Sequence, residues 1–154
     1  MVVPPADTEE MEALGHLIDA WLAAERASNP ILADVTRADD VPYRWYVRLV
    51  GEDKDFTTIW LTLGQRTLRY ETYVMPAPEE NSAELYDFLL RRNHGLVGAH
   101  FGIGPEDAIF LTGEIGVGSV DEVELDRIVG SVYAYVEQYF RSALRIGFAS
   151  RFRD

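Results

Sequence analysis

The sequence predicts an α+β fold in which an antiparallel sheet of about five strands packs against helices, in the order α-β-β-β-α-β-β-α. Strand-like segments follow one another through short turns, which is typical of antiparallel hairpins. Segments with the apolar spacing of helices precede, separate and follow these hairpins, so that helices can cover the sheet. The 154 residues, 47% of them hydrophobic, are enough for one domain, and we interpret 1–154 as a single domain with its core at about 8–146.

Three segments repeat apolar residues every three to four positions, as amphipathic helices do. They cover 7–28, 81–94 and 119–145. Asn81 with Glu84, and Ser119 with Glu122, have the spacing of capping boxes at the starts of the second and third helices. Gly95 follows the second segment, where we expect a left-handed C-terminal cap.

Five segments are rich in aromatic and β-branched residues and predict strands. They cover 44–50, 56–63, 68–75, 99–103 and 108–115. Short turns join the first three into a meander and the last two into a separate hairpin. The Asp-rich segment 31–42 is expected to be a connection, and the basic, aromatic segment 147–154 is expected to be loose.

Composition excludes several classes of function. The chain has no cysteine, which excludes disulfides and thiolate chemistry. The formal net charge of −12 disfavours nucleic acid as a partner, because an acidic surface repels phosphates. No apolar run approaches the ~18 residues of a membrane span, and the first residues lack the pattern of a signal peptide. We therefore expect a cytoplasmic protein with no membrane partner.

No catalytic or metal-binding motif is present in the sequence. His16, His94 and His100 are not spaced as ligands, and zinc normally needs three or four converging ligands. The segment 113–118 is rich in glycine, but the acidic residues that follow it would repel a phosphate at the helix start. We interpret it as a plain turn, and we expect no enzyme activity, no cofactor and no metal.

Alternation along the predicted strands divides their side chains between two faces. The face that includes Trp45, Phe101 and Ile103 is apolar and is expected to pack against helices. The other face carries aromatic residues among arginines and threonines, and Tyr, Trp and Arg are the residues most enriched at binding hot spots. We predict that a partner binds six residues of this face: Tyr46, Arg48, Trp60, Arg69, Tyr73 and Phe110. The alternatives are that the aromatic residues only stabilise the sheet by pairing across strands, or that a helix covers part of the face.

Two segments near the middle of the chain resemble those of a known family. Residues 89–94 read Leu-Leu-Arg-Arg-Asn-His, residues 98–103 read Gly-Ala-His-Phe-Gly-Ile, and a long helix begins in the acidic segment 121–126. This arrangement resembles the YbjN-like family of bacterial proteins over roughly residues 43–144. The resemblance implies the fold of type III secretion chaperones, which are small, acidic, usually dimeric and bind extended protein segments. The family is described as sensory transduction regulators, and the resemblance implies no catalytic residues.

Three hypotheses about function remain open at this point. The first is a non-enzymatic protein-binding module, a chaperone-like or regulatory adaptor that forms a homodimer and captures a partner segment on the aromatic face or at a sheet edge. The second is a small-molecule sensor or an enzyme that uses a cleft near Arg92, His94 and His100. The third is a structural subunit of a larger assembly, which a large apolar interface would support.

Overall fold

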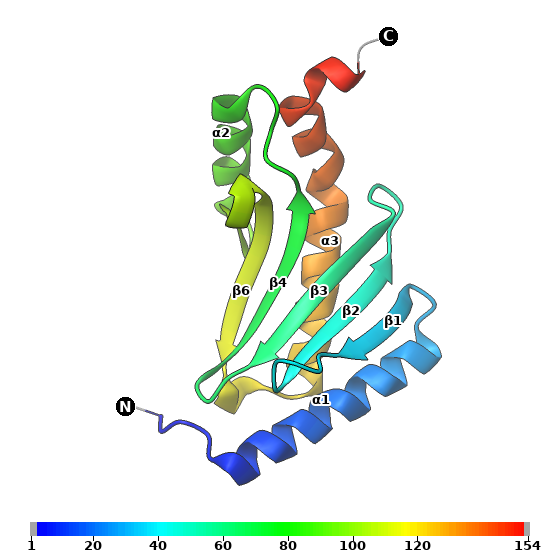
Figure 1. Ribbon diagram of the computed structural model, residues 1–154, viewed down its shortest axis with the longest axis vertical. Helices are drawn as coiled ribbons and strands as arrows, with labels where there is room; N and C mark the ends of the chain where they lie inside the picture. The colour runs from blue at the N-terminus through cyan, green and yellow to red at the C-terminus, as the bar shows by residue number, and fades with distance from the viewer. Residues whose placement is uncertain (1–2, 153–154) are drawn as a thin grey trace.

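The computed structural model describes residues 3–152, which form three α-helices, short 3-10 turns and one six-stranded sheet (Figure 1). The helices are α1 (Thr8–Ser28), α2 (Ser82–Asn93) and α3 (Glu122–Gly147). The strands are β1 (Leu32–Arg37), β2 (Arg44–Val50), β3 (Phe56–Leu63), β4 (Thr67–Met75), β5 (His100–Ile103) and β6 (Ile109–Gly116). Their order across the sheet is β1-β2-β3-β4-β6-β5, and all neighbours are antiparallel. The predicted α+β class is confirmed.

The helices pack against one face of the sheet. Figure 1 shows α3 running behind the middle of the sheet, α2 near the upper end of β6, and α1 along the β1 end. The indole N–H of Trp45, on this covered face, donates to Asp19 of α1 at 2.7 Å. Alternate residues of β2, β3 and β4 are buried here, including Trp45, Ile59, Leu61 and Tyr70. The core therefore lies between the helices and this face.

One strand, β1, was not predicted. It occupies part of the segment 31–42, which the sequence analysis interpreted as a connection, and it pairs with β2. Only Leu32 of its six residues is fully buried, and a bulge interrupts the pairing between Leu32 and Asp34. An edge strand of this kind lacks the apolar alternation of an inner strand, so its sequence resembles a polar loop. The sheet therefore has one strand more than the five segments predicted.

The ends of α2 differ from the prediction. Asn81 precedes the helix with a left-handed backbone (φ 55°), and its side chain makes no capping bond. Its amide instead donates to the backbone carbonyl of Ile146 at 3.0 Å, which ties the start of α2 to the end of α3. At the other end the left-handed glycine is Gly98 (φ 76°) rather than Gly95. The predicted capping box and the predicted C-terminal cap are both wrong.

The start of α3 lies slightly later than predicted. Asp121 is the capping residue, and its carboxylate accepts a hydrogen bond from the backbone N–H of Glu124 at 2.8 Å. Ser119 lies in a short 3-10 turn before the helix. The carboxylate of Asp121 has the same three-residue spacing to Glu124 that Ser119 has to Glu122, so the sequence offered two competing caps.

The residues after α3 are packed on the body of the protein. Phe148 is buried, and the 3-10 turn Ala149–Phe152 follows it. The Ser150 hydroxyl donates to Glu80 at 2.9 Å, and the guanidinium of Arg151 forms an ion pair with Glu79. The expectation of a loose segment is therefore wrong up to residue 152, and residues 153–154 lie outside the described part.

Candidate functional site

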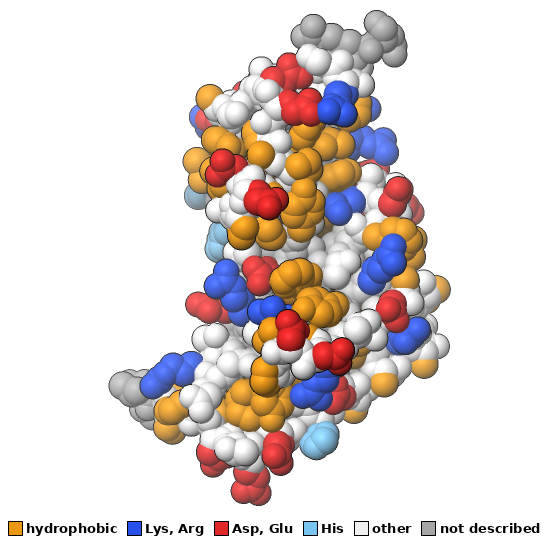
Figure 2. Space-filling view, in the orientation of Figure 1, with side chains coloured by type: hydrophobic (Ala, Val, Ile, Leu, Met, Phe, Trp, Pro, Cys, Tyr) orange, Lys and Arg blue, Asp and Glu red, His pale blue; other side chains and the backbone are white. Residues whose placement is uncertain are grey.

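The face of the sheet opposite the helices is open, since no helix or strand within residues 3–152 packs over it (Figure 1). Strand pairing places one residue from every strand in a continuous row, because directly opposed residues of antiparallel strands share a face. The row is Thr36, Tyr46, Trp60, Glu71, Thr112 and His100. Figure 2 shows hydrophobic side chains on this side of the molecule in patches between basic and acidic ones.

Two aromatic pairs form the apolar part of this open face. The rings of Tyr46 on β2 and Trp60 on β3 meet edge to face, with centroids 5.2 Å apart. Tyr73 on β4 and Phe110 on β6 form a second edge-to-face pair at 5.6 Å. Such a pair contributes about 0.5–1.5 kcal/mol beyond burial, yet Trp60 remains 41% exposed and Tyr73 45% exposed. Each pair therefore stabilises the sheet and still presents ring surface to solvent.

A cleft lies beside Tyr73, between β3 and β4 at one end of the sheet. The pairing between β3 and β4 extends only from Ile59 to Leu63 on β3, and the strands diverge beyond it (Figure 1). A cleft of about 460 Å³ lies there, lined by Phe56, Tyr73 and the α3 side chains Phe140 and Leu144, among others. Burial, together with the negative charge of Glu106, raises the pKa of the Tyr73 phenol. Both effects disfavour the phenolate form of Tyr73.

The six residues predicted to bind a partner all lie on the open face. The structure brings Tyr46 together with Trp60 and Tyr73 together with Phe110. The remaining two are arginines. The guanidinium of Arg69 lies 3.9 Å from the carboxylate of Glu71. The guanidinium carbon of Arg48 lies over the Phe56 ring, 3.7 Å from its centroid.

The six predicted binding residues omit two neighbours on this surface. Phe56 is 41% exposed and lies four positions before Trp60 on β3. Alternation alone therefore places it on the same face and could have identified it. Arg44 precedes Tyr46 by two residues and covers the Trp60 ring at 5.4 Å. One expected core residue also needs correction, because Ile103 lies on the helix side as predicted but is 53% exposed where β5 ends at the rim of the sheet.

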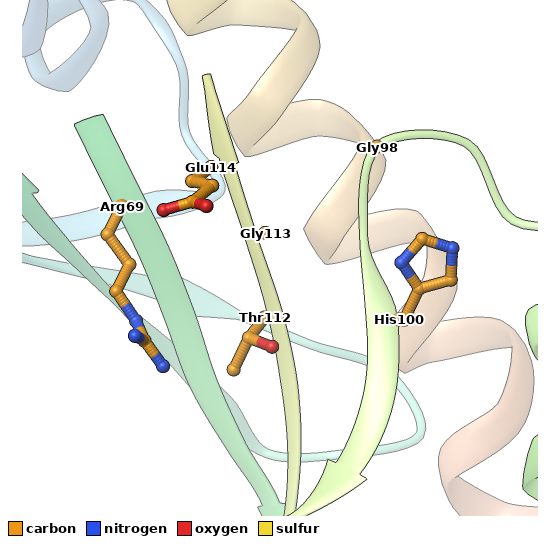
Figure 3. Close-up of a pocket in the computed structure, with 6 residues that line it drawn as sticks. All are labelled: Arg69, Gly98, His100, Thr112, Gly113 and Glu114. Atoms are coloured by element: carbon orange, nitrogen blue, oxygen red, sulfur yellow. The ribbon is translucent and has the colours of Figure 1, made fainter. Parts of the chain in front are cut away.

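A shallow hollow of about 420 Å³ lies around His100 (Figure 3). Its lining comprises Arg69, Gly98, His100, Thr112, Gly113 and Glu114. Figure 3 shows Arg69 and Glu114 on neighbouring strands, whereas the ring of His100 projects from the outer side of β5, away from both. His94 and Arg92 belong to the end of α2 and do not line the hollow. The three residues of the small-molecule hypothesis therefore do not surround one common cavity.

An apolar groove lies on the helix side, between α2 and the edge strand β5. It has a volume of about 350 Å³ and is lined by Tyr86, Leu89, Leu90, Phe101, Gly102, Ile103 and Ile109. Leu90 on α2 is 68% exposed and Ile103 on β5 is 53% exposed. The groove thus combines two large exposed aliphatic side chains with an aromatic floor.

The outer edge of β5 is occupied at its centre by a side chain of the same protein. The amide of Asn93 donates to the backbone carbonyl of Phe101 at 3.0 Å and accepts from its backbone N–H at 2.8 Å. These two groups of Phe101 therefore point away from β6, in the direction in which a further strand would pair. A partner strand can pair with Phe101 only after Asn93 has released it.

Two classes of site are not seen in the described part of the chain. Within residues 3–152, no cluster of three or more His, Asp or Glu side chains is arranged to hold a metal ion. None of the helices in this range is long and apolar enough to cross a membrane.

Residues 12–145 match the sequence model of a family described as "Putative bacterial sensory transduction regulator". The chain belongs to the YbjN family. The resemblance predicted from residues 89–103 is thus confirmed. The structure gives a physical reason for part of it, since Asn93 and Phe101 of these segments hydrogen-bond to each other.

Proteins of mycobacteria are similar to this YbjN-family chain. An uncharacterized protein of Mycobacterium tuberculosis is 35% identical over 114 residues, which cover 74% of the chain and 62% of the relative. An uncharacterized protein of Mycobacterium leprae is 33% identical over 139 residues, which cover 90% of the chain and 76% of the relative. The chain therefore spans less than two thirds of the length of the M. tuberculosis protein.

A solved structure shares the fold. A chain in the crystal structure of the ExsC–ExsE complex superposes with a TM-score of 0.56 and 16% identity, covering 85% of this chain and 93% of its own. At this identity the similarity shows a common fold. The type III secretion chaperone-like fold that the family resemblance implied is therefore confirmed.

Proposed function

We propose that this YbjN-family protein is a non-enzymatic protein-binding module that acts as a chaperone-like or regulatory adaptor in the cytoplasm. One observation carries the proposal: Trp60 and Tyr73 are more than 40% exposed on a sheet face that no helix or strand of residues 3–152 covers. Burying such rings under a partner removes apolar area from water, at roughly 25 cal/mol per Å². The fold neighbour, crystallised as a complex of two proteins, adds support.

The arrangement of the open face favours an extended partner segment. The Tyr46–Trp60 pair lies on β2 and β3, the Tyr73–Phe110 pair lies on β4 and β6, and a cleft lies beside Tyr73. A segment that lies along the strands of this face can rest an apolar side chain on one of these pairs. Aromatic anchors of this kind contribute most of the binding energy in interfaces, while the surrounding contacts exclude water.

The test compares binding by variants of the open face with binding by a variant elsewhere. Wild type, Tyr46→Ala with Trp60→Ala, and Val123→Ala serve as baits in a lysate of the source organism. The captured protein is then purified and its Kd measured by calorimetry. Val123 is 76% exposed at the start of α3 and provides the matched control. We expect the double variant to bind at least tenfold more weakly and the control to bind normally, with all three folded by circular dichroism. Equal affinity for all three would remove the case for this face.

We further propose that the protein acts as a homodimer through the groove between α2 and β5. Leu90 is 68% exposed and Ile103 is 53% exposed at this groove. Two large exposed aliphatic side chains that line one groove differ from the singly scattered exposed residues that need no explanation. Since Asn93 occupies the edge of β5 at Phe101, packing of the grooves is favoured over pairing of the strands.

The charges along α2 support a second copy as the occupant of this groove. The first half of the helix carries Glu84 and Asp87, and the second half carries Arg91 and Arg92. A two-fold axis perpendicular to α2 would bring the two copies of the helix together antiparallel, so that the acidic half of one faces the basic half of the other. The helix surface is thus complementary in charge to itself.

Light scattering after size-exclusion chromatography tests the dimer. We expect twice the chain mass for wild type and a single chain mass for Leu90→Glu, which puts a charge in the groove without disturbing a buried residue. Val123→Glu introduces the same charge at an equally exposed site and should remain dimeric. A monomeric wild type at high protein concentration, or a dimeric Leu90→Glu, would contradict the proposed interface.

A further inference from the structure

Two arginines of the open face have no carboxylate partner within residues 3–152. Seven arginines in this range form ion pairs with Asp or Glu, but Arg44 and Arg48 are not among them. Both project from β2 on the same face, on either side of Tyr46. They lack an ion pair although the chain has 26 acidic residues and 14 basic ones, so that carboxylates are in excess.

Aromatic rings and a threonine fix the orientation of both guanidinium groups. The guanidinium carbon of Arg44 lies over the Trp60 ring, 5.4 Å from its centroid, and the Nε of Arg44 donates to the Thr62 hydroxyl at 3.0 Å. Arg48 covers the Phe56 ring at 3.7 Å. Within residues 3–152 the terminal amino groups of both arginines make no hydrogen bond to another side chain or carbonyl. A stacked, planar guanidinium with unused donors is well prepared to bind a carboxylate through two parallel hydrogen bonds.

The acidic side chains nearest to these arginines in the sheet are engaged elsewhere. Asp34 lies opposite Arg48 in the β1–β2 register, but it forms an ion pair with Arg26 at 3.2 Å and accepts from the Thr36 hydroxyl. Glu71 lies opposite Trp60 in the β3–β4 register, 3.9 Å from Arg69. The two positive charges beside Tyr46 are therefore available to a ligand.

We propose that Arg44 and Arg48 bind two carboxylates of an extended partner segment that lies along β2. Four residues of a strand span roughly 13 Å, so the segment carries Asp or Glu at positions i and i+4. The residue at i+2 is apolar and rests on the Tyr46–Trp60 pair between the two arginines. This inference rests on the proposed protein-binding function and adds the chemical class of the partner segment.

Because the whole protein is acidic, Arg44 and Arg48 can attract carboxylates only at short range. The net charge of −12 repels an acidic segment at long range. Salt screening limits the distance over which exposed charges interact to about 8 Å at physiological ionic strength. Only a segment whose carboxylates reach the two guanidinium groups gains from them. Acidic segments with another spacing are repelled without compensation, which makes the spacing selective.

A displayed library of random 12-residue peptides tests the proposal without knowledge of the partner. The baits are wild type, Arg44→Gln with Arg48→Gln, Trp60→Ala and Arg145→Gln. Arg145 is the matched control, because it is exposed like Arg48, stacks on a ring (Phe152) and forms no ion pair within residues 3–152. For wild type and the control we expect peptides with acidic residues four apart to be enriched at least fivefold over the unselected library. Anisotropy with the best such peptide should show at least tenfold weaker binding to the double variant.

The other outcomes separate this inference from the proposed function. If wild type selects peptides that lose affinity with Trp60→Ala but are not acidic, or bind the double arginine variant equally well, the open face still binds protein and the carboxylate inference is overturned. If the selected peptides bind Trp60→Ala as tightly as wild type, the open face itself is not the site. A wild-type bait that enriches no family of peptides also counts against the inference.

Discussion

The two faces of the sheet each carry a tryptophan at neighbouring ladder positions, and the two residues have different surroundings. Trp45 is 1% exposed on the covered face and hydrogen-bonds to Asp19 of α1. Trp60 pairs with Tyr46, the next residue along β2, on the open face and is 41% exposed. The same residue type therefore contributes to folding on one side and is left available for binding on the other. Mutations on the two faces should separate stability from recognition.

The largest effect on stability is expected for Trp45→Ala. Removal of this buried ring leaves a cavity and deprives one carboxylate oxygen of Asp19 of its hydrogen-bond donor, and such changes typically cost about 3–5 kcal/mol. Urea unfolding followed by circular dichroism measures the change in the free energy of unfolding. A loss below about 1 kcal/mol would mean that the covered face is not the main source of stability.

Asn93→Ala should have the next largest effect. It removes both hydrogen bonds to Phe101 and leaves the backbone groups of this buried residue without a partner, for which we expect a loss of about 1–3 kcal/mol. The amide proton of Phe101 should also exchange faster with solvent in an NMR experiment. Asn93→Asp retains only the acceptor and should lie between wild type and Asn93→Ala. Unchanged exchange at Phe101 would show that Asn93 does not protect this edge.

Trp60→Ala should change stability less, although it is the same substitution as at Trp45. It loses one edge-to-face pair and the stacked Arg44, which together are worth about 1–2 kcal/mol. The same urea titration measures it, so the two tryptophans can be compared directly. A loss as large as that for Trp45→Ala would erase the distinction between the faces.

The smallest effect concerns pH and lies at the cleft where the strands diverge. Burial lowers the pKa of the Lys54 ammonium from its usual 10.5, and the charges of Asp55 and Glu137 only partly oppose this. As the pH falls from 10.5 towards the lowered pKa, the unfolded chain takes up the proton first, so the free energy of unfolding decreases. The free energy of unfolding of wild type, relative to that of Lys54→Met, should therefore rise as the pH is raised from the lowered pKa towards 10.5. A flat difference would place Lys54 in solvent.

The sequence predicted much of the sheet because alternation in β2, β3 and β4 is regular. In each of these strands, buried residues such as Val47, Leu61 and Tyr70 alternate with more exposed ones. The same rule fails for β1, where the charged residues Asp34 and Arg37 lie in an edge strand that contacts little of the core. Local pattern thus predicts strands that are covered on one face and misses a strand at the rim.

The details of the open face depend on contacts between strands, which local sequence does not encode. Alternation placed Tyr46 and Trp60 on one face, but their direct pairing follows from the register of β2 and β3. The stacking of Arg48 on Phe56 and the divergence of β3 from β4 depend likewise on register. The helix caps were wrong for a related reason, since Asn81 bonds to Ile146 in a distant helix instead of to its own.

The hydrogen bonds of Asn93 to Phe101 also bear on how the protein behaves when it is crowded. Aggregates and amyloid fibrils grow when the exposed edge of one sheet pairs with the edge of another molecule. At the centre of β5 the groups needed for that pairing are already occupied. A fibril that grows from this side must first break two internal hydrogen bonds, so a single asparagine protects a protein with an open aromatic face from polymerising at its neighbouring edge.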